Sequence, residues 1–259
     1  MFRIHNPPRW RKVVSKRWYQ ENKRDPWRRD AKSKGYRARS AYKLKQIQER
    51  FGILKLGDSV LDIGCYPGGW TQVAVEEVGT EGIVIGVDIL ATSPVEGATT
   101  LVGDITNEGT VEAIMGVLDG RGLNVVISDI SPRLTGRYDT DQAISLELST
   151  MALDVASRLL VPKGCFVTKV FQGAGIEGIV EAARLRFSSV GRFSPTASRT
   201  ASSETYLICQ NRLKKNKGDG KTAMEYLQRH LGNIGIVVER DQGTNDDSLV
   251  GFRKIEKRE

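Results

Sequence analysis

Short apolar segments alternate with amphipathic segments along the middle of the chain. The apolar segments are bounded by turn residues and have the lengths of buried strands. They are residues 59–63, 83–88, 99–102, 124–129, 164–170, 187–194 and 205–209. Between them, apolar residues recur at helical spacing, which predicts helices near residues 70–78, 110–118, 141–160 and 175–186. A further helix is predicted over residues 40–51, where Gly52 would end it.

Strands that are apolar on both faces and separated by helices predict a parallel sheet covered on both sides. The connection between the last two strands, residues 195–204, is too short and too polar for a crossover helix, so that strand pair should be antiparallel. We therefore expect a Rossmann-like α/β fold whose seven-stranded, mostly parallel sheet has one antiparallel strand. No apolar run approaches the roughly 18 residues that span a bilayer, so we expect no membrane partner.

Charge is unevenly distributed along the chain. Residues 1–50 contain 17 Lys and Arg against 4 Asp and Glu, whereas residues 51–210 contain 11 against 19. The basic segment also carries Trp10, Trp18, Tyr19, Trp27, Tyr36 and Tyr42. Cations neutralise phosphates and aromatic faces stack on unpaired bases, so this composition favours contact with RNA or DNA. The alternative is a solvated segment whose tryptophans pack locally on the domain.

These differences divide the chain into three parts. They are a basic aromatic arm of residues 1–34, an α/β domain of residues 35–210, and a polar linker with a small C-terminal appendage of residues 211–259. In the last part we expect a helix near residues 222–231, a strand over residues 234–239 and a weak hairpin in the remainder. The sequence assigns no role to this appendage.

A glycine-rich turn joins the first predicted strand to the next helix. Its sequence is Gly64-Cys65-Tyr66-Pro67-Gly68-Gly69-Trp70. Ligands of doubly wound sheets bind beyond the carboxyl ends of the strands, where glycines let the backbone approach them. A tight turn that needs glycine for its dihedral angles would show the same pattern.

Two carboxylates strengthen the ligand interpretation. Asp88 ends the second strand, where an acidic side chain commonly holds a ribose hydroxyl pair, and Asp104 follows the third, within reach of an adenine amino group. A helix cap or a turn residue is the alternative for each of them.

The turn suits S-adenosyl-L-methionine better than a dinucleotide. Gly64, Gly68 and Gly69 do not match the G-x-G-x-x-G spacing, and Pro67 lacks the backbone N–H that a phosphate cradle would use. S-adenosylmethionine has no pyrophosphate and carries a sulfonium cation, which an acidic domain favours. We therefore expect S-adenosylmethionine as the cofactor.

Four ionisable residues stand in apolar surroundings at the ends of predicted elements: Lys43, Asp129, Lys169 and Glu204. The fourth and fifth strands flank the central crevice of such a sheet, so Asp129 and Lys169 should meet there. A lysine within a buried strand is costly unless it is paired or functional. The alternative is a lysine that extends to solvent at the strand end while it is paired with Asp129.

At these positions the sequence resembles the FtsJ/RrmJ-type ribose 2′-O-methyltransferases, bacterial and archaeal enzymes that act on large-subunit ribosomal RNA. The resemblance covers about residues 35–210 and is most specific at Pro67-Gly68-Gly69-Trp70 and Lys169-Val170-Phe171-Gln172-Gly173. Further matching motifs are Arg39-Ser40-Ala41-Tyr42-Lys43-Leu44, Asp62-Ile63-Gly64, Val87-Asp88-Ile89-Leu90, Gly103-Asp104, Ser128-Asp129-Ile130-Ser131-Pro132 and Ser203-Glu204-Thr205-Tyr206. Cys65 and Tyr66 depart from the family, which usually has small residues there.

The resemblance implies a Rossmann-like S-adenosylmethionine-dependent methyltransferase fold and a catalytic tetrad of Lys43, Asp129, Lys169 and Glu204, with Lys169 central. It also implies a set of cofactor contacts: Gly68, Gly69, Trp70, Asp88, Asp104 and Asp129. Two roles for Lys169 are open. An amine would accept the proton of the ribose 2′-hydroxyl, whereas an ammonium would position that hydroxyl and stabilise its developing charge.

The implied activity is 2′-O-methylation of a uridine in large-subunit ribosomal RNA, either free or within the assembled large ribosomal subunit. Methylation of the anticodon loop of transfer RNA and a non-catalytic role in ribosome assembly are the alternatives. The spacing of Cys65, Cys165 and Cys209 matches no metal site, and no metal is expected. The few cysteines favour a reducing, cytoplasmic setting. Nothing resembles a coiled-coil seam, so we expect a monomer.

Overall fold

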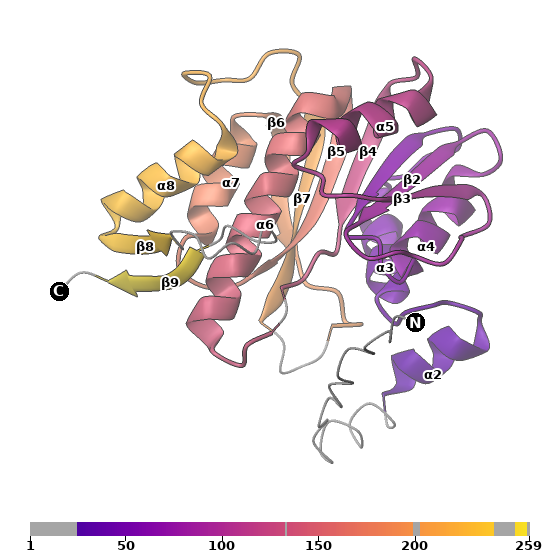
Figure 1. Cartoon of the computed structure of the whole chain (residues 1–259), viewed down its shortest axis with the longest axis horizontal. Coiled ribbons are helices and arrows are strands. Elements are labelled where there is room, and N and C mark those ends of the chain that lie inside the picture. Colours follow the sequence, from indigo (N-terminus) through magenta and orange to yellow (C-terminus); the bar gives the residue numbers. More distant parts are fainter. Residues whose placement is uncertain (1–24, 133, 199–202, 241–251, 258–259) are drawn as a thin grey trace, which may run out of the picture.

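A seven-stranded sheet in the order β3-β2-β1-β4-β5-β7-β6 forms the centre of the computed structural model, which describes residues 25–132, 134–198, 203–240 and 252–257 (Figure 1). Its strands are β1 (Ser59–Ile63), β2 (Ile83–Asp88), β3 (Ala98–Val102), β4 (Leu123–Ser128), β5 (Leu160–Phe171), β6 (Phe187–Phe193) and β7 (Glu204–Arg212). The helices are α2 (Pro26–Ser33), α3 (Ala41–Phe51), α4 (Gly69–Val78), α5 (Glu108–Leu118), α6 (Tyr138–Leu159), α7 (Ile176–Arg184) and α8 (Ala223–Asn233).

Strand direction confirms the predicted mostly parallel sheet. The neighbours from β3 to β5 pair in parallel, whereas β7 pairs antiparallel with both β5 and β6. Because β7 runs in the opposite direction, its first residue, Glu204, pairs with Phe171 at the end of β5. The start of β7 therefore lies at the carboxyl edge of the parallel strands.

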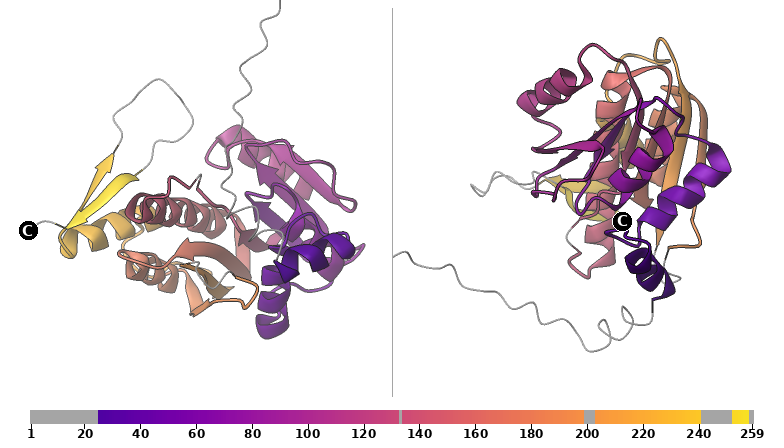
Figure 2. Two further views of the ribbon diagram at one scale, coloured as in Figure 1. Left: turned by 90° about the horizontal axis from the view of Figure 1, so that it is seen from below. Right: turned by 90° about the vertical axis from the view of Figure 1, so that its right-hand side faces the viewer.

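Helices cover both faces of the sheet, as Figures 1 and 2 show. Alternate residues of each central strand enter different cores. In β1, Val60 packs with the core of α3 and α4, whereas Leu61 and Ile63 pack with the core of α5 to α8. The sheet is thus buried on both sides, as the continuous apolar runs predict.

Strand β5 is longer than predicted at its beginning. The triplet Pro162-Lys163-Gly164 has the composition of a turn, yet β5 starts at Leu160, directly after α6. Leu160 pairs with Leu123, and the register shifts before Val125 pairs with Cys165. This irregularity accommodates the turn-forming residues within the strand.

Helix α2 lies inside the segment predicted as a basic arm and packs on the domain. The ring of Trp27 lies 5.0 Å from that of Tyr42, and the ring of Tyr36 lies 5.8 Å from it on an edge. Tyr42 is buried and Trp27 and Tyr36 are partly buried, so these three aromatics pack locally, as the alternative predicts. The other predicted stacking residues, Trp10, Trp18 and Tyr19, lie outside the described residues.

The C-terminal helix α8 belongs to the same core as α6 and α7, through Tyr226, Leu227 and Leu231. Asp154 of α6 accepts hydrogen bonds from the backbone N–H groups of the first two residues of α8, at 2.6 and 3.2 Å. After it, β8 (Ile236–Arg240) pairs antiparallel with β9 (Phe252–Lys257). The hairpin therefore includes the strand predicted over residues 234–239 and is not confined to the remainder of the chain. No helix in the described ranges combines the length and the apolar character needed to cross a bilayer.

Candidate active site

Three strands and one helix bring the predicted catalytic residues together at the carboxyl edge of the sheet. Asp129 directly follows β4, Lys169 lies near the end of β5, and Glu204 opens β7. Since β4 and β5 are parallel and β7 starts at the same edge, these positions are neighbours in space. Lys43 reaches the group from α3, on the face that α3 and α4 cover.

Lys169 and Asp129 form a buried ion pair. The Nζ of Lys169 donates a hydrogen bond of 2.7 Å to the backbone carbonyl of Asp129 and one of 3.1 Å to its Oδ1. The two side chains are 5% and 17% exposed, respectively. Lys169 is therefore held inside the protein and does not extend to solvent, which disfavours the alternative drawn from the sequence.

Lys43 and Glu204 form a second buried ion pair between Nζ and Oε1, with side chains 10% and 11% exposed. Burying two such pairs side by side is expensive unless their geometry compensates for the lost hydration. The structure thus brings the four predicted residues together as two ion pairs. Their assignment to catalysis stays a prediction.

Tyr206 joins the two pairs and was absent from the predicted set. Its hydroxyl donates a hydrogen bond of 2.7 Å to Asp129 Oδ1, and the ammonium of Lys43 lies 5.9 Å from its ring centroid. Burial, together with the nearby Asp129 carboxylate, raises the pKa of Tyr206 well above its usual value, so it acts as a neutral donor. A tyrosine within a buried strand needs a partner for its hydroxyl, and that signal was available in the sequence.

The carboxyl group of Asp129 is held as an anion. Burial on its own would raise the pKa of Asp129, but the positive charges of Lys169 and Lys43 and the hydrogen bond from Tyr206 outweigh it. The pKa of Asp129 is therefore below its usual value. The site consequently presents a fixed negative charge beside the amino group of Lys169.

The glycine-rich turn after β1 requires its glycines. Gly64 has φ +75°, and a Cβ there would lie 2.9 Å from Cβ of Ile130, in the segment that follows Asp129. Gly68 has φ +107°, and a Cβ there would meet Val95 at 3.0 Å. The turn thus has no room for a side chain at Gly64 or Gly68, so the packing of the turn explains both glycines.

Asp88 and Asp104 both make the local hydrogen bonds expected of turn residues. Asp88 accepts bonds from the backbone N–H groups of Tyr66, at 3.0 Å, and Leu90, at 2.8 Å, so it ties the glycine-rich turn to the end of β2. Asp104 Oδ1 accepts from the backbone and the hydroxyl of Thr106, at 2.8 and 2.7 Å. These bonds place the two carboxylates at the ends of β2 and β3; their contact with the cofactor stays a prediction.

Trp70 connects the turn to the two ion pairs. Its indole is 3% exposed, donates a hydrogen bond of 2.8 Å to the carbonyl of Ser40, and lies 5.6 Å from the ring of Tyr206. The indole is thus used in internal packing between α3, α4 and β7. Contact between Trp70 and the cofactor stays a prediction.

Asp62 is a further buried carboxylate at this edge that the predicted site left out. Its Oδ2 accepts a hydrogen bond of 2.7 Å from Thr71, whereas Oδ1 has no hydrogen-bond partner among the described residues. Burial, with the Asp129 and Asp88 carboxylates nearby, raises the pKa of Asp62 to about 7. An unpartnered oxygen among three carboxylates fits a cationic ligand, and S-adenosylmethionine carries both an ammonium and a sulfonium.

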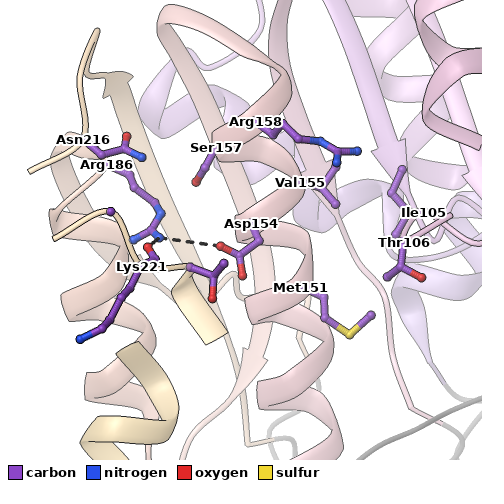
Figure 3. A pocket seen from close by; sticks show the side chains of 12 residues that line it. Ile105, Thr106, Met151, Asp154, Val155, Ser157, Arg158, Arg186, Asn216 and Lys221 are labelled. Atoms are coloured by element: carbon purple, nitrogen blue, oxygen red, sulfur yellow. Dashed lines mark hydrogen bonds and ion pairs between the residues drawn. The ribbon is translucent and has the colours of Figure 1, made fainter. Parts of the chain in front are cut away.

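The described ranges contain no group of three or more His, Cys, Asp or Glu side chains that could hold a metal ion. A separate cavity of about 450 Å³ lies between α6 and the segment that precedes α8 (Figure 3). Its wall includes Arg186 and Asp154, which face one another at 3.7 Å. None of the predicted site residues lines this cavity.

The comparisons with known proteins agree with this geometry. A family described as FtsJ-like methyltransferase matches residues 36–212. The ribosomal RNA large subunit methyltransferase E of Methanothrix thermoacetophila is 50% identical over 187 residues, which are 72% of each chain. The enzyme of the same name from Marinobacter nauticus is 42% identical over 200 residues, or 77% of this chain and 97% of that one.

A solved structure shows the same fold. The crystal structure of a ribosomal RNA methyltransferase from Plasmodium falciparum superposes with a TM-score of 0.62 at 25% identity, and covers 70% of this chain and 100% of that one. The family match spans the sheet, the glycine-rich turn and both ion pairs. The chain therefore belongs to the FtsJ-like methyltransferases, a family of enzymes that use S-adenosyl-L-methionine.

Proposed function

We propose that this enzyme methylates the ribose 2′-hydroxyl of a uridine in large-subunit ribosomal RNA, either free or within the assembled large ribosomal subunit. The observation that carries the proposal is the buried contact of Lys169 with Asp129 at the edge where the glycine-rich turn lies. The names of the relatives point to the same class of RNA.

Carboxylates and the glycine-rich turn would hold the cofactor. S-adenosylmethionine, when bound, supplies a methyl group activated by its sulfonium. In this proposal Asp62 receives a cationic part of the cofactor, Asp88 the ribose and Asp104 the adenine, while Gly68, Gly69 and Trp70 lie alongside it. The negative charge at the ends of β1, β2 and β4 favours that cation over a phosphate-bearing ligand.

Lys169 would act on the hydroxyl that receives the methyl group. Two positions around its Nζ are directed to the carbonyl and the carboxylate of Asp129, which leaves one for the ribose. In the ammonium form that position carries an N–H that donates to the 2′-oxygen; in the amine form it carries a lone pair that accepts the proton. In the amine form Nζ takes up the proton that the 2′-hydroxyl loses on methylation, whereas in the ammonium form that proton leaves to solvent.

The other buried residues would position the Nζ of Lys169. Asp129 fixes Nζ from one side, and Tyr206 fixes the Asp129 carboxylate by donating to the same oxygen. The ion pair of Lys43 with Glu204 places a positive and a negative charge near the ring of Tyr206. With the groups held in this way, alignment of the hydroxyl with the methyl group supplies much of the acceleration.

The proposal includes the setting of the enzyme. Basic residues ahead of α2 would bind the RNA backbone, while the acidic domain binds the cofactor. Cys65, Cys165 and Cys209 are free thiols, in keeping with work in the reducing cytoplasm. We propose that a single chain is sufficient for activity.

Methyl transfer to three RNA preparations tests the proposal. Purified enzyme and labelled S-adenosylmethionine are incubated with naked large-subunit RNA, with undermethylated large subunits, and with bulk transfer RNA, and the labelled nucleotide is mapped. Label in a uridine of the first or second preparation is expected. Label in transfer RNA alone would favour the anticodon-loop alternative. Cofactor binding with no label in any of the three would favour the non-catalytic assembly factor.

A further inference from the structure

Exposed apolar side chains gather at the catalytic edge of the sheet. Of the nine large apolar side chains that are strongly exposed in the described ranges, six lie at or beyond the carboxyl ends of β1 to β4: Tyr66, Ile89, Leu90, Val102, Leu134 and Tyr138. The first four flank the carboxylates that we assign to the cofactor. The last two follow Asp129, and Tyr138 contacts the segment that follows Lys169, so these carboxylates do not account for the exposure of Tyr138.

Tyr138 combines an exposed ring with a tethered hydroxyl. The side chain is 53% exposed, and its hydroxyl donates a hydrogen bond of 2.5 Å to the backbone carbonyl of Gln172. One helical turn later, Gln142 donates a bond of 2.7 Å to the carbonyl of Ala174. Two bonds thus fasten the first two turns of α6 to the turn after β5, and the bond from Tyr138 tethers its ring there.

This position is fixed relative to the catalytic residues. Gln172 lies three residues beyond Lys169 along the same segment, and its backbone N–H donates a bond of 2.8 Å to the carbonyl of Ser203. Ser203 immediately precedes Glu204. The ring of Tyr138 is therefore tied through the backbone to both ion pairs of the site.

The loop that precedes Tyr138 is built to present side chains to solvent. Asp141, which is 6% exposed, accepts bonds from the backbone and the hydroxyl of Thr135, at 2.7 and 2.8 Å, and from the backbone of Gly136, at 3.1 Å. These bonds fix the loop from within. Leu134 is 67% exposed on it, and Arg137 is also exposed.

An exposed aromatic ring on a segment that also exposes a leucine and an arginine matches the chemistry of an unpaired nucleotide. Bases stack on aromatic faces, and guanidinium groups bind the phosphates that flank them. We propose that Tyr138 is a stacking platform for an unpaired base of the RNA strand that carries the target ribose. This inference rests on the proposed function, since it names the part of the site that grips the RNA.

A purely structural role for Tyr138 depends on a different part of the side chain. Stacking needs the ring, whereas fastening α6 to β5 needs the hydroxyl. Tyr138→Phe keeps the ring and removes the hydroxyl, Tyr138→Leu keeps an apolar side chain without the ring, and Tyr138→Ala removes both. Comparison of the three variants separates the two roles.

The experiment measures kcat and KM for the RNA that the wild type methylates, together with the cofactor Kd and the melting temperature of each variant. Tyr138→Phe is expected to keep KM within about 2-fold of the wild-type value. Tyr138→Leu and Tyr138→Ala are expected to raise KM by about 10-fold, which is the loss of affinity expected for one stacked base. The cofactor Kd should stay constant. Equal KM values for Tyr138→Phe and Tyr138→Ala would overturn the proposal. So would an unchanged KM in Tyr138→Leu and Tyr138→Ala. Leu56→Ala, at an 83% exposed position before β1, is the matched control and should leave KM unchanged.

The stacking role of Tyr138 can be tested even where the proposed function fails. If the wild type methylates transfer RNA instead of ribosomal RNA, the same comparison is made on transfer RNA. If it methylates no RNA, the Kd for a fluorescent single-stranded oligouridylate replaces KM. In each case the order of Phe, Leu and Ala decides whether the ring of Tyr138 binds RNA.

Discussion

The hydroxyl of Tyr206 and the ammonium of Lys169 share one acceptor, Oδ1 of Asp129, at 2.7 and 3.1 Å. Tyr206 and Lys169 are paired across the antiparallel ladder of β5 and β7. The register of that ladder therefore sets the surroundings of a carboxylate that belongs to a third strand segment, after β4. A donor on one strand and a cation on the other together keep Asp129 ionised.

Removal of the Tyr206 hydroxyl tests this relationship. Tyr206→Phe should lower the free energy of unfolding by about 2 kcal/mol, because a buried carboxylate loses one donor. The same loss should lower kcat by roughly 10-fold, since Asp129 then fixes Lys169 less well. Urea unfolding and steady-state methyl transfer measure the two effects. Tyr66→Phe, at a half-exposed position, is the control and should leave the free energy of unfolding unchanged.

The pH dependence of the same variant follows from the sign of the Asp129 shift. The pKa of Asp129 is lower in the folded than in the unfolded protein, so its stabilisation is present above the usual pKa of 3.8 and is lost as pH falls through the folded value. In Tyr206→Phe the folded pKa of Asp129 moves upward. The stability that Asp129 loses on acidification should then be smaller, and the loss should be complete at a higher pH than in the wild type. Identical stability curves for the two proteins below about pH 4 would contradict the role given to Tyr206.

For Asp62 we predict the opposite pH dependence of stability. Its folded pKa of about 7 lies above the usual 3.8, so its stabilisation is complete below pH 3.8 and is lost as pH rises through about 7. Asp62→Asn cannot ionise. The variant should therefore melt at a higher temperature than the wild type at about pH 8, and the difference should shrink towards about pH 4.

The affinity for the cofactor should depend on the ionisation of Asp62. A cation bound beside Asp62 favours its ionised form, so wild-type affinity for S-adenosylmethionine should rise between about pH 6 and pH 8. The Asn variant should lose that rise. Calorimetric titration across this range measures it, and parallel curves for the two proteins would exclude Asp62 from the cofactor site.

The basic arm can be shortened without disturbing α2. Asp25 caps that helix by accepting a hydrogen bond from the backbone N–H of Arg28 at 3.2 Å, so a truncation should end at residue 24. Deletion of residues 1–24, which include eight Lys and Arg, should weaken RNA binding and reduce its dependence on salt, because fewer counterions are released. The cofactor Kd should not change. An unaltered salt slope, measured by filter binding, would show that the arm does not bind phosphate.

The sequence predicts the sheet because the central strands are buried on both faces. The bounds of β1 and β2 equal the apolar runs from which they were predicted. The apolar pattern fails at β5, where Pro162 and Gly164 have the composition of a turn but lie inside a strand with shifted register. It also fails at α2, whose charged sequence hides its helical periodicity, although Asp25 and Pro26 carry the signal of a helix start.

The candidate site was predicted as far as strand order allows. Strands that flank the crevice place Asp129 next to Lys169, and that follows from topology alone. Which oxygen Tyr206 binds depends on the register of β5 and β7, which apolar periodicity does not determine. The unpartnered oxygen of Asp62 likewise depends on packing, because its neighbours Thr71 and Asp88 come from other elements.

Methyl transfer by Lys169→Ala tests the central claim most directly. The variant and the wild type are compared side by side on undermethylated large ribosomal subunits with labelled S-adenosylmethionine, and RNA affinity is measured on the same preparations. Lys163→Ala, at an exposed position of the same strand, is the control. We predict that Lys169→Ala loses transfer by a factor on the order of 1,000 or more, while its RNA Kd stays within about 3-fold of the wild type. Transfer at the wild-type rate with unchanged RNA binding would contradict the account.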